Sequence, residues 1–196
     1  GEGLMPDSRI AAARLGLEIS ESDGYPFRGI RFQTASHSVE ADFSHGWGIG
    51  VRRRLLHLAL IRAAEQAGVE MRWGSPVSLN EAIGAKWIIG ADGASSLVRR
   101  WAGLDATVTT SRRFARRRHF AVAPWSDHVE IHWAQGCQAY VTPVAPNEIC
   151  LALISRSQDL RLADGLRHFP ALAARLRKGS EASRDRGSLT GTVRLR

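Results

Sequence analysis

The residues best suited to hold an anionic or hydroxyl-bearing ligand lie between Trp87 and Leu104, in the sequence WIIGADGASSLVRRWAGL. The apolar run 87–89 is typical of a short strand buried on both faces. Gly90 and Gly93 permit a tight backbone turn where this strand ends, and the turn carries Asp92. An acidic turn directly after a buried strand predicts a place to bind a phosphate or a ribose hydroxyl, although such turns also occur as plain connections.

A short basic helix is predicted directly after this turn. Ser95 or Ser96 can cap the segment 96–103, whose free N–H groups and dipole favour a nearby anion. Arg99 and Arg100 lie one turn into the segment and add positive charge. Strand, acidic turn and helix must therefore be positioned together for the site to work.

The segment resembles the Asp-Gly fingerprint of FAD-dependent monooxygenases of the para-hydroxybenzoate hydroxylase class. That fingerprint has an apolar strand, then GADG, then a serine four residues after the aspartate, then Val-Arg. The matching positions here are Asp92, Gly93, Ser96, Val98 and Arg99. The resemblance implies that Asp92 and Gly93 approach the pyrophosphate or ribityl region of FAD, and that Ser96 and Arg99 support the turn.

Two further segments resemble the same family. Arg53 begins a helix-like pattern that ends at Gly68, as in the family's Arg-led helix, and the resemblance implies that Arg53 faces the cofactor. Residues 1–6, GEGLMP, resemble the piece after the second strand in geranylgeranyl-reductase-like and halogenase-like members.

The resemblance implies an enzyme in which NAD(P)H reduces FAD and the reduced flavin, with oxygen, hydroxylates a small organic substrate. A flavin-dependent reductase or halogenase of the same fold is the alternative, and no catalytic base is assigned.

The sequence departs from the family at both ends. It has no GxGxxG turn for the FAD pyrophosphate, because Gly46, Gly48 and Gly50 have the wrong spacing, and no acidic residue ends a second strand. The family's second flavin fingerprint, a Gly-Asp turn, is also missing before Arg196. We therefore expect an internal fragment of a longer enzyme.

The elements that position these residues predict an α/β protein, α+β overall. Residues 1–106 are expected to form a partial FAD/NAD(P)-binding dinucleotide fold that includes a hairpin over 28–43. Other elements expected there are helices over 9–15 and 53–67 and a strand over 69–73. Residues 107–196 are expected to form a substrate-binding domain, truncated before the second flavin fingerprint.

Short alternating strands dominate the second half. They are predicted over 114–123, 129–133, 139–144 and 149–155, followed by a helical pattern over 160–178 with a break at Pro170. Such a meander resembles the antiparallel layer that these flavoenzymes place over the flavin ring.

Two residues of this layer are predicted to face the substrate. Tyr140 begins YVTP, where reductase-like and halogenase-like relatives often have Trp-x-x-Pro, but a core or edge tyrosine fits equally well. His132 shares one strand face with His128 and Glu130, which invites a metal site. Without a further ligand we expect no metal there, and assign these polar residues to the surface or to the substrate.

The net charge of +8 over 196 residues comes almost wholly from arginine, since Lys86 and Lys178 are the only lysines. The densest cluster, RRFARRRH at 112–119, accompanies no nucleic-acid-binding signature, so nucleic acid is not the expected partner. Arg116 and Arg117 are expected to attract the phosphates of NAD(P)H. An arginine-rich polyanion-binding module without flavin is the rival of another class.

Cysteines and hydropathy add two expectations. Cys137 and Cys150 are in no metal-binding spacing, so two buried thiols are expected. No apolar run approaches the roughly 18 residues of a membrane-spanning helix, and a cytoplasmic protein is expected.

Overall fold

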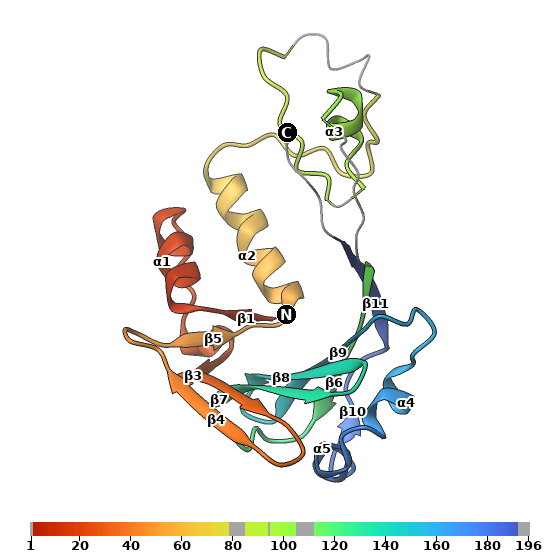
Figure 1. Cartoon of the computed structure of the whole chain (residues 1–196). Helices are drawn as coiled ribbons and strands as arrows, with labels where there is room; N and C mark the ends of the chain where they lie inside the picture. Colours follow the sequence, from red (N-terminus) through yellow and green to blue (C-terminus); the bar gives the residue numbers. More distant parts are fainter. Residues whose placement is uncertain (1, 79–84, 94, 105–111, 192–196) are drawn as a thin grey trace.

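A large, mostly antiparallel sheet forms the body of the molecule (Figure 1). The computed structural model describes residues 2–78, 85–93, 95–104 and 112–191. In spatial order the sheet contains β10 (Ser180–Glu181), β6 (Arg112–Ala121), β9 (Glu148–Ser155), β8 (Cys137–Ala145), β7 (His128–Ala134), β3 (Gly29–Gln33) and β4 (Ser38–Asp42), and β11 (Arg186–Gly191) also pairs with β6. The predicted antiparallel layer is thus confirmed.

The predicted hairpin is confirmed as β3 and β4, with Ile30 opposite Ala41. It does not stand apart from the second half of the chain, because β3 pairs in parallel with β7 and Ile30 lies opposite Val129. The sheet therefore runs across the predicted boundary at residues 106 and 107. The division into two domains stays a prediction.

One face of the large sheet is covered by α4 (Leu162–Leu166) and α5 (Pro170–Leu176). Period-two alternation turns apolar residues of the strands toward these helices. Pro170 stands at the first helical position of α5, where its missing N–H costs nothing, so the predicted break is confirmed. The core between sheet and helices comprises Phe120, Cys137, Ala139, Val141, Ile149, Leu151, Leu153, Leu162, Phe169, Leu172 and Leu176.

A small three-stranded sheet packs against β8. It has the order β1 (Gly3–Leu4), β5 (Gly48–Gly50) and β2 (Tyr25–Phe27), and is accompanied by α1 (Pro6–Arg14) and the 3-10 turn η1 (Glu21–Asp23). The approach to β8 is close: a Cβ on Gly50 would lie 1.7 Å from the carbonyl oxygen of Pro143. Glycine at position 50 is therefore needed for the contact of the two sheets.

The helices α2 (Arg53–Gln66) and α3 (Leu97–Trp101) confirm two predicted helices but bury no side chain of their own. Predicted strands over 69–73 and 87–89 are wrong, because the structure, which describes both segments, leaves them outside any strand. Trp87 and Ile89 are 80% and 86% exposed. Neither segment has a neighbouring strand among the described residues to complete its hydrogen bonds, so apolar sequence alone does not produce a strand there.

Exposed large apolar side chains of the described residues concentrate in this same part of the chain. Between residues 55 and 104 they are Leu55, Leu58, Leu60, Val69, Trp73, Val77, Trp87, Ile88, Ile89, Leu97, Trp101 and Leu104. In the described part of the chain, no helix is both long and apolar enough to cross a membrane.

Candidate functional site

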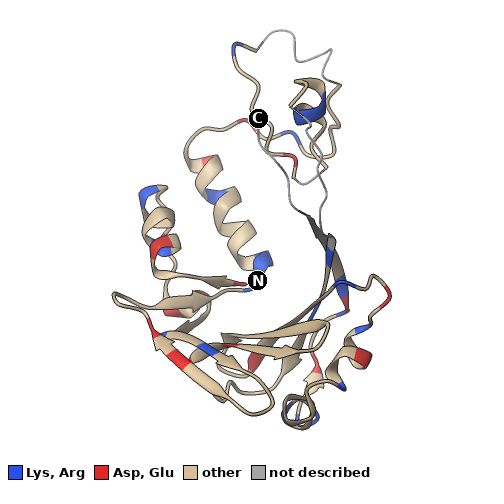
Figure 2. Cartoon of the chain, in the orientation of Figure 1, with Lys and Arg blue, Asp and Glu red and all other residues tan. Residues whose placement is uncertain are grey.

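An arginine-lined pocket opens beside the N-terminus of α2, on the sheet face opposite α4 and α5. Its volume is about 520 Å³. Figure 2 shows the positive segments at the start of α2 and along β6 and β11 that border it. We call it the arginine pocket; its lining residues are Glu2, Arg52, Arg53, Arg54, Arg117, His119, Ala182, Ser183, Arg184 and Arg186. Six arginines against one carboxylate make it a strongly positive cavity suited to an anion.

A buried carboxylate forms the base of this pocket. Oε2 of Glu2 lies 2.6 Å from Nε2 of His119, and Oε1 binds a guanidinium N–H of Arg117. The Arg53 backbone N–H, the first of α2, also donates to Oε1 at 3.2 Å. Burial alone raises the pKa of Glu2, but His119, Arg53 and Arg117 together hold that pKa below its ordinary value of 4.5. Glu2 therefore stays ionised and fixes both Arg117 and the start of α2.

His119 extends this arrangement toward the pocket lining. Its Nδ1 lies 2.9 Å from Oγ of Ser183, so the imidazole joins a hydroxyl at the pocket to the buried carboxylate of Glu2. Cys150 completes a buried group in which the ligand atoms of Glu2, His119 and Cys150 lie within 4.8 Å of one another. Burial raises the pKa of the Cys150 thiol to about 12, so the thiol remains protonated at neutral pH. The predicted burial of both thiols is confirmed.

The two arginines predicted to attract NAD(P)H point to opposite faces of β6. Arg117 faces Glu2 in the arginine pocket, whereas Arg116 donates to the carbonyl oxygens of Leu160 and Gln158 on the other side. Arg186 of β11 lies directly opposite Arg117 in the pairing of the strands. Like charges in this position repel, so an anion between them would be stabilising.

The Asp-Gly turn has a well-defined local geometry. Asp92 accepts hydrogen bonds from the Ser96 hydroxyl, from the Leu97 N–H at 2.6 Å and from the Val98 N–H at 3.3 Å. Ser96 in turn caps α3 by accepting from the Arg99 N–H at 3.0 Å, as predicted. The Ser96 hydrogen bond is the main cause that holds the pKa of Asp92 below its usual 3.8. Asp92 is thus an ionised residue that accepts hydrogen bonds from the first N–H groups of α3.

Gly93 takes the left-handed conformation that the turn requires, with φ of 84°, and a Cβ there would meet open space. Asp92, Gly93, Ser96 and the Arg99 backbone therefore lie together. Arg53 does not join them: it begins α2 at the arginine pocket, and Figure 1 shows α3 well away from that end of α2.

The two residues predicted to face the substrate lie on opposite faces of the large sheet. Tyr140 is paired with Ile131 and His132 with Ala139, and directly opposed residues share a face. Ala139 belongs to the core under α4 and α5, so His132 is on that side, where its ring meets the edge of Phe169. Tyr140 is on the side of the arginine pocket, and its hydroxyl donates to Gln138 at 3.2 Å.

The shared face of His128, Glu130 and His132 is used for ion pairs. His128 lies 2.8 Å from carboxylate oxygens of both Asp42 and Asp127. Burial alone raises the pKa of Glu130, but hydrogen bonds from His132, Trp125 and Arg31 hold it below 4.5. The sequence pattern found this face but not its partners, which come from β3, β4 and the loop before β7.

Sequence reasoning missed Glu2, Ser183, Arg184 and Arg186 as members of a site. The arginine cluster at 112–119 was the available signal, since it contains Arg117 and His119. The partners come from the two ends of the chain, and no spacing rule connects residues that are brought together only by strand pairing.

Comparisons with known proteins agree with the fold. No protein-family model matches the sequence, and no curated protein matches it. Among solved structures the chain shares its fold with flavin-dependent halogenases, reductase-like proteins and oxygenases. This confirms the predicted fold class and the structural resemblance to the FAD-dependent monooxygenase class.

Three solved structures illustrate the likeness. The flavin-dependent brominase Bmp2 has a TM-score of 0.78 at 16% identity, over 100% of this chain and 58% of that chain. A geranylgeranyl bacteriochlorophyll reductase-like protein from Thermoplasma acidophilum has 0.77 at 19% identity, over 97% of this chain and 56% of that chain. The oxygenase of 2-methyl-3-hydroxypyridine-5-carboxylic acid has a TM-score of 0.67 at 19% identity, over 97% of this chain and 60% of that chain. This chain therefore spans less than two thirds of the length of each.

Proposed function

We propose that this chain is part of an FAD-dependent oxidoreductase in which the arginine pocket holds phosphate groups of the cofactor. The observation that carries the proposal is a cavity lined by six arginines, beside a helix N-terminus, in a fold shared with proteins described as flavin-dependent. A helix N-terminus and guanidinium groups are both suited to bind phosphate oxygens.

The residues present fit the phosphate-bearing part of FAD. At about 520 Å³ the pocket has the size of a small-molecule site, and its positive charge complements a pyrophosphate. Arg53 and Arg117 would hold the phosphates. The turn of Asp92 and Gly93, with Ser96 and Arg99, lies away from this pocket, so we assign it no contact with the same phosphates. When bound, FAD would supply the redox chemistry, which protein side chains lack.

The chain's own residues would bind the cofactor phosphates and orient the groups that hold them. Glu2 holds Arg117 through an ion pair and caps α2 through the Arg53 N–H, so one buried carboxylate fixes both Arg117 and the start of α2. His119 joins Ser183 to Glu2 through two hydrogen bonds and so links the pocket lining to that carboxylate. Tyr140, on the same side of the sheet, remains the proposed substrate-facing aromatic.

The finer assignment within this class is an NAD(P)H-dependent monooxygenase that hydroxylates a small organic substrate in the cytoplasm. The fold neighbours include a brominase, a reductase-like protein and an oxygenase, so a reductase or a halogenase is the alternative within the same fold. The Asp-Gly fingerprint of the monooxygenase class supports the first choice.

The test is equilibrium binding of FAD, ADP and riboflavin to the purified protein and to two variants, followed by flavin fluorescence or, for ADP, by calorimetry. If the phosphates are recognised, FAD and ADP bind and riboflavin binds much more weakly. Arg117→Gln should weaken FAD binding about tenfold, equivalent to ~1.4 kcal/mol. Arg116→Gln removes the same charge from the other face of β6 and should leave FAD binding unchanged.

Equal binding of all three ligands, or equal effects of the two substitutions, would overturn the proposal. The rival class makes a different prediction: an arginine-rich module binds heparin with a steep salt dependence and retains no FAD. Heparin binding without FAD binding would therefore replace the flavoenzyme by a polyanion-binding module.

A further inference from the structure

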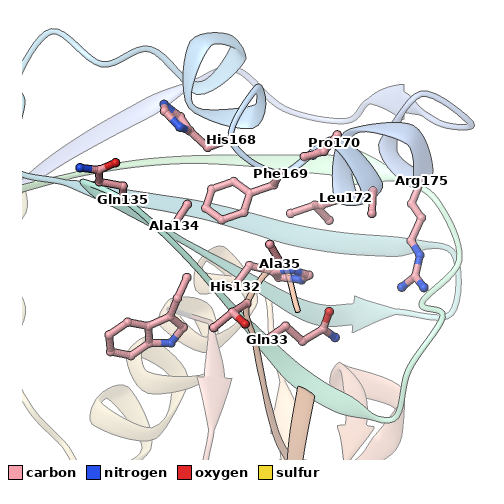
Figure 3. A pocket seen from close by; sticks show the side chains of 13 residues that line it. Gln33, Ala35, His132, Ala134, Gln135, His168, Phe169, Pro170, Leu172 and Arg175 are labelled. Carbon is pink, nitrogen blue, oxygen red and sulfur yellow. The ribbon is translucent and has the colours of Figure 1, made fainter. Parts of the chain in front are cut away.

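A second cavity lies on the opposite side of the large sheet from the arginine pocket. Its volume is about 430 Å³, and it opens between the turn after β3, the hairpin of β7 and β8, and the start of α5 (Figure 3). The side chains that surround it are Gln33, Thr34, Ala35, His132, Trp133, Ala134, Gln135, His168, Phe169, Pro170, Ala171, Leu172 and Arg175. We call it the α5 cavity. Nothing in the proposed flavin chemistry uses it.

The floor of the α5 cavity is apolar and belongs to the packed core. Phe169 and Leu172 are 6% and 2% exposed and belong to the core between sheet and helices. The ring of His132 stands edge-on to that of Phe169, with centroids 6.1 Å apart. A floor of well-packed rings and aliphatic groups favours the apolar body of a small ligand.

Polar groups flank this floor at its two ends. Figure 3 shows His168 on one side of Phe169 and Arg175 on the other, with Gln33 and His132 between. Gln135, at the hairpin of β7 and β8, adds a further polar side chain near His168. The cavity thus combines an apolar floor with a cationic end.

Arg175 has donors to offer because the nearby carboxylate is satisfied by other residues. Glu130 accepts from Arg31 at 2.8 Å, from Trp125 at 3.0 Å and pairs with His132 at 3.0 Å. Arg175 forms a long ion pair with the same carboxylate at 3.9 Å, beyond hydrogen-bond distance, so its N–H groups are not used by Glu130. Its guanidinium instead lies over the ring of Trp125, 5.1 Å from the centroid, and its side chain is half exposed.

We infer that the α5 cavity binds a small amphipathic carboxylate, with the apolar body against Phe169 and Leu172 and the carboxylate on Arg175. A guanidinium presents two parallel N–H groups to a carboxylate, and the cation–π contact with Trp125 favours this position of the Arg175 side chain. Arg31 pairs with Glu130 at 2.8 Å, which limits the repulsion of a second carboxylate by Glu130. His132, predicted to face a substrate, faces this ligand.

The inference is tested by titrating the protein with octanoate and benzoate, and with octanol and benzyl alcohol as neutral counterparts, followed by calorimetry. The carboxylates should bind and the alcohols should bind at least tenfold more weakly. Arg175→Gln should abolish this preference. Arg177→Gln makes the same change two residues later on a side chain outside the cavity, and should leave binding unchanged.

Two further variants locate the binding. Ala134→Trp, which fills the cavity from β7, should abolish binding of all four probes, with circular dichroism confirming the fold. Arg117→Gln should change FAD binding but not octanoate binding, which separates this site from the arginine pocket. Octanoate binding that survives both Arg175→Gln and Ala134→Trp, or no binding of either carboxylate at about 10 mM, would overturn the inference.

Discussion

Oε2 of Glu2 lies 2.6 Å from Nε2 of His119, although 117 residues separate them in the sequence. Glu2 precedes β1 of the small sheet and His119 belongs to β6 of the large one, so this contact joins the N-terminal end of the described chain to the large sheet. Both side chains are buried, at 2% and 6% exposure. Because the same carboxylate binds Arg117 and the first N–H of α2, it organises the arginine pocket from below.

Replacing Glu2 by glutamine should destabilise the protein by about 1–3 kcal/mol, since the neutral amide leaves Arg117 and His119 poorly paired in a buried site. The midpoint and slope of urea unfolding measure this loss. Glu70→Gln is the control, because Glu70 pairs with Arg72 at the surface with both side chains 74% exposed. Equal destabilisation by the two substitutions would show that the Glu2 contacts contribute nothing specific.

Stability should fall in acid, and Glu130 should account for a measurable part of the loss. The pKa of Glu130 is held below 4.5 by its hydrogen bonds with His132 and Trp125 and by Arg31. A carboxyl whose pKa is lower in the folded state contributes stability above its unfolded pKa and loses it as pH falls through the folded pKa. The contribution is therefore complete at neutral pH and disappears below 4.5.

The measurement is urea unfolding of the wild type and of Glu130→Gln at about pH 7 and about pH 3.5. The variant should be less stable than the wild type at the higher pH, and the difference should shrink at the lower pH. The Glu40→Gln variant tests specificity, because Glu40 is 44% exposed and also binds Arg31. If the difference in unfolding free energy between the wild type and Glu130→Gln is the same at both pH values, the assignment is contradicted.

The second half of the fold was predictable from sequence because local residue patterns define its strands and helices. Over 149–155, alternation places Ile149, Leu151 and Leu153 on α4 and α5, which Pro170 separates. Over 129–133, the apolar residues lie on the opposite face of the sheet from these helices. Local patterns succeed where an element is completed by its neighbours in the sequence.

The failures share one cause, which is dependence on distant parts of the chain. The runs 69–73 and 87–89 are apolar enough for strands, but among the described residues no strand lies beside them. Tyr140 and His132 were both predicted to face the substrate, and only the pairing of β7 with β8 reveals their opposite orientation. The Asp92 turn was predicted correctly as a local structure, while its separation from Arg53 depends on tertiary structure.

Gly50→Ala should destabilise the protein by about 1–3 kcal/mol, because the added Cβ would overlap the Pro143 carbonyl oxygen and push the small sheet from β8. Gly187→Ala on β11 is the control, since its Cβ would meet nothing closer than 3.9 Å. A strand glycine is less stable than alanine by roughly 0.5–1 kcal/mol, so this control should be neutral or stabilising. Thermal unfolding of both variants measures the difference, and similar melting temperatures would refute the close packing of β5 on β8.

Ser96→Ala should loosen the start of α3 without affecting the sheet. The hydroxyl of Ser96 accepts from the Arg99 N–H and donates to Asp92, so its removal takes away the helix cap and one support of the Asp-Gly turn. Loss of such a cap costs about 1 kcal/mol of local stability, equivalent to roughly fivefold faster amide hydrogen exchange at Arg99. Ser96→Thr keeps the hydroxyl and should restore slow exchange, while Ser95→Ala removes a neighbouring hydroxyl that does not cap the helix. Unchanged exchange at Arg99 in Ser96→Ala would mean that α3 and the turn are held by contacts other than this cap.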